Sequence, residues 1–87
     1  MTMQERILLA IADFQAREAM PPTLREIGAA VELLSTGHVA HHITALAGKG
    51  LIRRRERIAR GVWLTAAGVA RVAALRDAEN TERGVAA

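Results

Sequence analysis

Only three residues, Glu32-Leu33-Leu34, separate two stretches of helical sequence, and this short break limits the fold more than any other feature. Before the break, Thr23 and Glu26 have the T-x-x-E spacing of a capping box, which predicts the start of a helix. After the break, Ser35 is a preferred N-cap, and residues 35–49 carry apolar side chains at helical spacing. Two helices joined by so short a turn cross steeply, so the second keeps one face exposed.

Another helix is predicted before this pair. Thr2 and Glu5 repeat the capping-box spacing, and apolar residues then recur at helical spacing to about Glu18. Pro21-Pro22 ends this helix because proline lacks an amide hydrogen and disfavours helical geometry in the residue before it. The first half of the chain therefore predicts three consecutive helices.

The hydrophobic period changes after Gly50, a residue that can adopt the left-handed conformation with which helices end. Residues 51–56 and 61–64 predict two short strands, and residues 57–60 predict the turn between them. Strand alternation places Trp63 opposite its two neighbours. We expect Trp63 to pack against the last helix or a second subunit, with contact to a bound ligand as the alternative.

A fourth helix is predicted to begin at Thr65, which can cap it, and to fade near Asp77. Its apolar positions are Val69, Val72 and Leu75. We therefore expect residues 1–78 to form one mostly helical domain and residues 79–87 to form a frayed tail. The predicted fold is a winged helix-turn-helix, with a three-helix core, a small β-hairpin as the wing and a C-terminal fourth helix.

Positive charge is concentrated in the predicted hairpin. Six basic residues and one acidic residue lie between positions 49 and 60, whereas the formal net charge of all 87 residues is +3. Such a cluster attracts a polyanion and displaces its condensed counterions, which favours a nucleic-acid partner. A solvated basic hairpin is the alternative. Arg57 and Arg60, placed at the predicted tip, are the strongest candidates for phosphate contact.

Composition argues against several other classes of protein. The chain has no Cys, hence no disulfide framework or thiolate metal site, which suits a reducing cytosol. The apolar stretch 7–12 is far shorter than the ~20 residues that span a bilayer, and no leader peptide is evident. No nucleophile, base and orienting group can be assembled. We expect a cytoplasmic, nucleoid-associated protein without catalytic activity, cofactor, membrane contact or small-molecule substrate.

The third predicted helix has an exposed face suited to a groove in DNA. Val39, Ile43 and Leu46 form its buried stripe, and the opposite face carries small and hydrogen-bonding side chains. That composition fits the major groove, where side chains read the donor and acceptor edges of bases. His38, His41 and His42 also permit a metal-binding interpretation, although a single helix rarely supplies a complete tetrahedral set.

Six segments carry a family resemblance. They are Met20-Pro21-Pro22-Thr23, Arg25-Glu26-Ile27-Gly28, Ser35, Ala45-Leu46-Ala47, Lys49-Gly50-Leu51-Ile52 and Arg60-Gly61-Val62. Together they resemble the DNA-binding domain of LexA repressors, over about Ile7 to Leu64 without a gap. The resemblance implies that the third helix enters the major groove of double-stranded DNA and that the hairpin forms a wing against the backbone.

The resemblance also implies roles for individual residues. The family's base-reading positions fall on Ser35, Gly37, His38, Ala40 and His41, and its phosphate contacts fall on Thr23, Lys49 and Arg60. From the helix and the charge pattern we add Thr36 to the base-reading candidates. To the phosphate-contacting candidates we add Arg25, His42, Arg53, Arg55 and Arg57.

Two departures from the family are evident. Ala40 and His41 stand where LexA reads bases with acidic side chains, so we expect a different operator. The self-cleaving protease domain with its Ser-Lys pair is not present in the 87 residues, so inactivation by self-cleavage is not expected. The segment 64–68 instead resembles the end of the wing in MarR-like regulators, in which a following helix often helps dimerisation.

These observations predict a site-specific transcriptional regulator, a repressor that blocks polymerase, with a possible homodimer through the fourth helix. Pairing about a two-fold axis would suit a palindromic site. Two alternatives stay open, a protein-interaction adaptor that uses the fourth helix or the wing, and a metal-responsive regulator that uses the three histidines.

Overall fold

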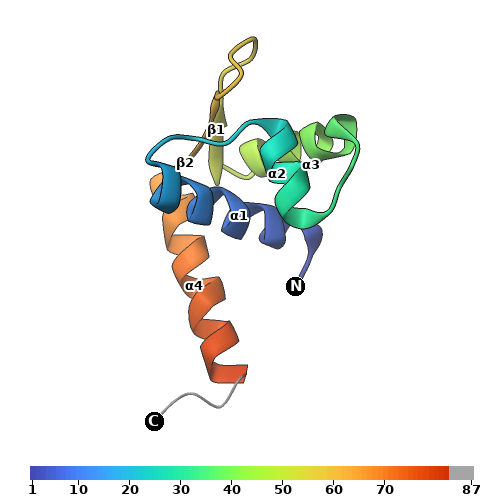
Figure 1. The fold of residues 1–87 in the computed structure, drawn as a ribbon. Coiled ribbons are helices and arrows are strands. Elements are labelled where there is room, and N and C mark those ends of the chain that lie inside the picture. The colour runs from blue at the N-terminus through green and yellow to red at the C-terminus, as the bar shows by residue number, and fades with distance from the viewer. Residues whose placement is uncertain (83–87) are drawn as a thin grey trace.

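The computed structural model describes residues 1–82, in which six elements follow one another in the predicted order. They are α1 (Met3–Glu18), α2 (Leu24–Val31), α3 (Thr36–Gly48), β1 (Ile52–Arg54), β2 (Val62–Leu64) and α4 (Ala66–Glu82). The first three helices pack together, the hairpin projects from one end of the molecule, and α4 extends towards the other (Figure 1). The fold is a winged helix-turn-helix, as predicted.

The predicted capping residues begin the helices. At α1, the Thr2 hydroxyl accepts a hydrogen bond from the Glu5 amide at 3.2 Å, and the Glu5 carboxylate accepts one from the Thr2 amide at 2.8 Å. The same reciprocal pair joins Thr23 and Glu26 at α2. At α4, the Thr65 hydroxyl accepts from the Gly68 amide and donates to the Gly50 carbonyl. Local hydrogen bonding therefore sets where these three helices begin.

The core lies between the three helices and the base of the hairpin. Its buried side chains are Ile7, Leu8, Ile11, Ile27, Val31, Val39, Ile43, Leu46, Ile52, Val62 and Val72. The predicted stripe of α3 is fully enclosed, with Val39 and Ile43 at 0% exposure. Because this side of α3 is held in the core, its other side faces outward.

The turn between α2 and α3 depends on a close backbone approach. Glu32 ends α2 with φ 61°, and the Leu33 amide donates to the Gly28 carbonyl at 2.8 Å. A Cβ at Gly28 would lie 2.5 Å from the Leu33 carbonyl oxygen and 3.3 Å from Cγ2 of Val39. Only glycine fits here without movement of the turn, so Gly28 fixes how closely the two helices approach.

The strands of the hairpin are shorter than predicted. β1 and β2 are antiparallel and three residues each, with Ile52 opposite Leu64, Arg53 opposite Trp63 and Arg54 opposite Val62. The expected strand 51–56 is therefore trimmed at both ends and the strand 61–64 at the wing end, where Arg57 has φ 66° and the backbone turns. Pairing stops there because a left-handed residue leaves the extended conformation.

Trp63 lies on the opposite face of the strand from Val62 and Leu64, as predicted. It shares a shallow surface pocket with Arg53, Arg54, Arg55 and Leu64, all of which belong to the hairpin. Among the described residues that line this pocket, none comes from α4. Cross-strand pairing places Trp63 beside Arg53, and its packing on the last helix or on a second subunit stays a prediction.

Two expectations for α4 are wrong. Val69 is 57% exposed, and the inward side of the helix instead carries Gly68, Val72 and the half-buried Leu75. The reason is a close approach at Gly68, where a Cβ would lie 2.0 Å from the Leu51 carbonyl oxygen. The helix also continues beyond Asp77 to Glu82.

Side-chain contacts tie α4 to α1 along its length. Arg71 pairs with Glu5 at 3.5 Å, and Arg76 pairs with Asp13. Both contacts lie before Asp77, within the part of the helix that was expected. Of the tail expected at 79–87, residues 79–82 are helical, and residues 83–87 lie outside the described part.

Candidate nucleic-acid interface

The first half of α3 presents an exposed polar surface. The Ser35 hydroxyl caps the helix and accepts a hydrogen bond from the His38 amide at 3.3 Å. The side chains of Thr36, His38 and His41 are exposed, and Gly37 leaves the backbone between them uncovered. Five of the six predicted base-reading residues therefore face solvent on one helix.

Ala40 and His42 lie at the edges of this surface. Ala40 is half-buried, and its carbonyl accepts a hydrogen bond from the Thr44 hydroxyl at 3.0 Å. His42 is also half-buried, and its Nδ1 is enclosed without a hydrogen-bond partner among the described residues. The rings of His41 and His42 meet edge-on, with centroids 5.7 Å apart. His42 can therefore offer only Nε2 to an outside group.

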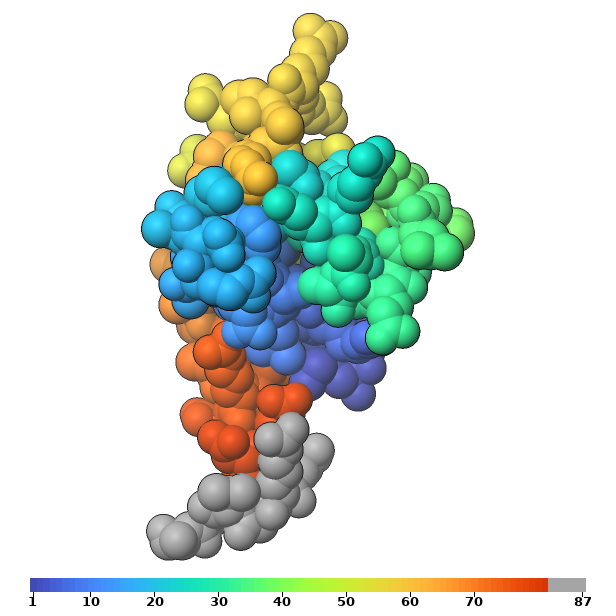
Figure 2. Space-filling model, in the orientation of Figure 1, coloured from blue at the N-terminus to red at the C-terminus, as the bar shows by residue number. Residues whose placement is uncertain are grey.

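A groove runs between the wing, the start of α2 and the first turn of α3, and we call it the wing groove. It is lined by Thr23, Leu24, Arg25, Thr36, Arg54, Arg55, Glu56, Arg57, Ile58, Ala59 and Val62. Figure 2 shows the wing standing above α2 and α3. The wing groove unites five predicted residues, which are Thr23, Arg25, Thr36, Arg55 and Arg57. Cationic side chains thus border the exposed end of α3.

Arg53 and Arg54 lie on opposite faces of the hairpin because successive strand residues alternate. Arg54 shares a face with Val62, and its Nη1 donates to the Thr44 hydroxyl of α3 at 3.4 Å. Arg53 lies on the other face with Trp63. Arg54 was absent from the predicted site, although counting the alternation outward from buried Ile52 would have placed it towards α3.

Lys49 is separated from the wing groove. It follows the last residue of α3, at the opposite end from Ser35, and its Nζ donates to the Gln4 side-chain oxygen at 2.7 Å. The side chain is exposed. Lys49 therefore extends the basic surface along α3 towards the start of α1.

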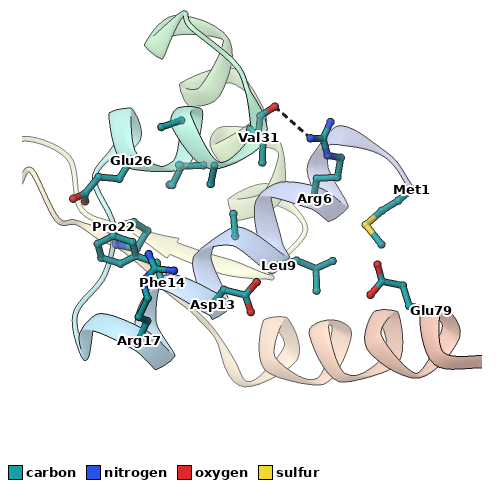
Figure 3. A pocket seen from close by; sticks show the side chains of 14 residues that line it. Met1, Arg6, Leu9, Asp13, Phe14, Arg17, Pro22, Glu26, Val31 and Glu79 are labelled. Atoms are coloured by element: carbon teal, nitrogen blue, oxygen red, sulfur yellow. Dashed lines mark hydrogen bonds between the residues drawn. The ribbon is translucent and has the colours of Figure 1, made fainter. Parts of the chain in front are cut away.

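Arg60 lies at the foot of the wing, whereas the sequence placed it at the tip. Its Nη1 lies 2.7 Å from Glu26 Oε1, and its Nη2 lies 3.2 Å from Glu26 Oε2. Nη1 also donates to the Pro21 carbonyl at 2.9 Å. The guanidinium lies over the ring of Phe14, 5.7 Å from the centroid. Figure 3 shows Phe14, Pro22 and Glu26 gathered at one end of the neighbouring pocket.

The carboxylate of Glu26 is stabilised in its ionised form. The hydrogen bond from Arg60 lowers its pKa below the ordinary value of 4.5, and the amide of Thr23 lowers it further. Glu5 has a lowered pKa for a related reason, since the Thr2 amide donates to it. Both carboxylates therefore stay charged at neutral pH.

Comparison with known proteins decides the family. Residues 1–61 match the LexA DNA binding domain family. The chain belongs to this family. Over 64 residues it is 45% identical to the LexA repressor of Acidothermus cellulolyticus, covering 74% of this chain and 23% of that protein. Over 51 residues it is 49% identical to the LexA repressor of Streptomyces coelicolor, covering 59% of this chain and 22% of that protein.

A more distant relative gives the same picture. The LexA repressor 1 of Geobacter sulfurreducens is 41% identical over 61 residues, covering 70% of this chain and 30% of that protein. The chain therefore spans less than a third of the length of these LexA relatives. The family match includes the three helices and most of the wing, and it ends at position 61, so β2 and α4 lie beyond it.

The sequence did not predict the exposure of one apolar residue of this LexA family domain. Leu34 is fully exposed in the turn immediately before Ser35. The break that contains Leu34 is only three residues long, which is too short to show a hydrophobic period. The sequence therefore did not predict that Leu34 is exposed. Leu34 thus adds an apolar side chain beside the capped end of α3.

The histidines of this LexA family domain do not form a prepared metal site. Within residues 1–82, no group of three or more His, Asp and Glu side chains is positioned to hold a metal ion. The metal-responsive alternative therefore gains no support from their placement. Within the same residues, no helix is both long enough and apolar enough to cross a membrane.

Proposed function

We propose that this chain binds a specific double-stranded DNA sequence and represses transcription from promoters that contain it. One observation carries the proposal, namely that the capped, exposed end of α3 and the arginines of the wing border the same groove. In a LexA DNA-binding domain this arrangement lets one element enter the major groove while another reaches the flanking backbone. The relatives named above are repressors.

Residues at the start of α3 read bases. They are Ser35, Thr36, Gly37, His38, Ala40 and His41. The major groove admits an α-helix and displays a distinct set of donors and acceptors for each base pair. Imidazole and hydroxyl groups donate to and accept from those edges, and the half-buried methyl of Ala40 suits contact with a thymine methyl.

Thr23 and the basic residues around α3 hold the DNA backbone. They are Thr23, Arg25, His42, Lys49, Arg53, Arg55 and Arg57. Contacts to phosphate fix the register of the protein and release counterions, but they carry no sequence information. The free amides in the first turn of α3 add a site for a phosphate at the positive end of the helix.

Repression follows from occupancy. A protein of this size that covers part of a promoter excludes polymerase from the same DNA, without a catalytic step. Such a protein would reside with the nucleoid. Because the operator-reading positions include Ala40 and His41, its operator would differ from that of relatives with acidic side chains there.

We extend the proposal to a homodimer paired through α4. The side of α4 turned away from the core exposes Ala70, Ala74 and Ala78, whose small side chains permit close approach of a second helix. If two copies cross antiparallel at Ala74, Arg71 of one copy lies opposite Asp77 of the other, and symmetry repeats the pair. A two-fold dimer would present two copies of α3 to a palindromic site.

Selection of bound duplexes from a random library tests DNA recognition. We expect an enriched motif for the unaltered chain and a relaxed motif for His41→Ala. Arg57→Ala should weaken all duplexes alike and lower the salt dependence of binding by about one counterion. Arg76→Ala on α4 removes an exposed arginine far from α3 and is the matched control. No enrichment by the unaltered chain would refute the proposed function.

Sedimentation equilibrium tests the pairing of α4. We expect Ala74→Glu to shift the chain to monomer, since it places a carboxylate at the crossing point. Asn80→Glu adds the same charge at an exposed position about 120° around the helix from Ala74, and it should leave the mass unchanged. An unaltered chain that is monomeric at high concentration would refute the dimer alone.

A further inference from the structure

Arg60 is bound to the protein through most of its donor groups. An arginine has five N–H donors, and three of its hydrogen bonds here go to Glu26 and to the Pro21 carbonyl. The two bonds to Glu26 are parallel, one to each carboxylate oxygen, which is the geometry that arginine forms best. Phe14 covers part of the guanidinium, and the side chain is 35% exposed.

Glu26 connects Arg60 to the beginning of α2. The same carboxylate that binds the guanidinium accepts a hydrogen bond from the Thr23 amide at 2.8 Å. Thr23 in turn caps α2 through its hydroxyl. One carboxylate therefore joins the foot of the wing to the helix that packs against α3.

The residue after Arg60 transmits this restraint into the wing. The Gly61 carbonyl accepts from the Arg55 amide at 2.7 Å, and a Cβ at Gly61 would lie 2.3 Å from the Arg55 carbonyl oxygen. The two arms of the wing thus approach each other closely, directly beside Arg60. Fixing Arg60 consequently fixes the direction in which Arg55 and Arg57 leave the body.

We propose that Arg60 is a positioning residue that sets the angle of the wing through Glu26, and that it does not contact DNA phosphate. This inference rests on the proposed function, because the wing must meet the backbone while α3 occupies the groove. A phosphate near Arg60 would also meet the negative charge of Glu26. Arg55 and Arg57 are exposed and carry the phosphate contacts instead.

Two conservative substitutions separate positioning from phosphate contact. Glu26→Gln keeps an oxygen that can complete the capping box but removes the charge that holds Arg60. Arg60→Lys keeps a positive charge but loses the two-pronged geometry. Affinity for the selected duplex is measured by fluorescence anisotropy over a range of salt concentrations, for both variants and for their combination.

A positioning role predicts that both variants weaken binding, each by roughly three- to thirtyfold, and that the double variant is no weaker than the worse single one. Glu26→Gln should also reduce the salt dependence although it makes the protein more positive, because displaced Arg55 and Arg57 no longer release counterions. Tighter binding by Glu26→Gln, together with near-normal binding by Arg60→Lys, would overturn the inference. Arg57→Gln serves as the comparator for loss of one direct phosphate contact.

A measurement without DNA keeps the inference independent of the proposed function. Hydrogen exchange of the Arg55 amide, which bonds the Gly61 carbonyl, should accelerate in Glu26→Gln and in Arg60→Lys, while exchange in the buried turns of α1 stays unchanged. Unchanged exchange in the wing would overturn the inference even if DNA binding is confirmed. Absence of duplex binding by the unaltered chain would refute the proposed function. The hydrogen-exchange result would then still test the role of Arg60.

Discussion

Replacing Gly28 by alanine should destabilise the domain although alanine favours helices. The added Cβ would lie 2.5 Å from the Leu33 carbonyl oxygen, and that oxygen must withdraw by roughly 0.9 Å to reach ordinary contact at 3.4 Å. Better helix propensity contributes about 1 kcal/mol in favour of alanine. Overpacking against backbone opposes it by about 3 kcal/mol, the upper end of the usual range, because a carbonyl cannot change rotamer. The expected net loss is about 2 kcal/mol.

Gly48→Ala is the matched control for this substitution. Gly48 also lies in a helix, and nothing stands within 4 Å of the Cβ that alanine would add. Thermal unfolding followed by circular dichroism compares the two. At about 4–8 °C for each kcal/mol, Tm should fall by about 8–16 °C for Gly28→Ala and rise by up to about 8 °C for Gly48→Ala. A Gly28→Ala variant that melts at or above the unaltered chain would refute the close approach in the turn.

Three further predictions concern the caps and one carboxylate. Ser35→Ala should lower stability by about 0.5–2 kcal/mol through loss of the α3 cap, and an unchanged Tm would contradict the Ser35–His38 hydrogen bond. Glu32→Gly should raise Tm by a few degrees, because glycine adopts φ 61° without the cost of a side chain; a lower Tm would count against it. The folded-state pKa of Glu26 is lowered below 4.5, so its stabilisation is present above the unfolded value and is lost as pH falls below about 4.5. In Glu26→Gln, the free energy of unfolding, measured by urea titration at several pH values, should fall less steeply below about pH 4.5. An unaltered pH dependence would show that Glu26 does not contribute.

Local signals predicted most of the fold. Each capping residue forms hydrogen bonds within three positions of itself, so Thr2, Thr23 and Ser35 reveal their helices in sequence order. The buried stripe of α3 was also evident, because Val39 and Ile43 are spaced for one helix face. Short-range chemistry of this kind does not require knowledge of the tertiary contacts.

The errors arose where distant segments meet. Val69 has the spacing of a buried position, yet Gly68 lies against Leu51 and rotates α4 so that Val69 faces outward. In the sequence, Arg60 is indistinguishable from the other cations of the wing. Its partner Glu26, however, lies 34 positions earlier in the chain. Neither contact leaves a periodic pattern, so propensity and charge alone could not predict them.

The site residues show the same division. The outward face of α3 follows from helical periodicity, and the structure exposes His38 and His41 as that periodicity predicts. The grouping of Arg25 with the wing arginines does not follow from spacing, because it depends on how the hairpin sits on α2. Their roles towards DNA stay predictions that the variants above address.

The wing and the last turn of α4 lie at opposite ends of the molecule (Figure 1). A fluorophore, an affinity tag or a surface linker attached beyond Glu82 would therefore stand clear of a bound duplex. The amino end offers less room, because Gln4 is bonded to Lys49 beside α3. Biosensor or immobilisation designs based on this domain should accordingly be anchored through the carboxyl end.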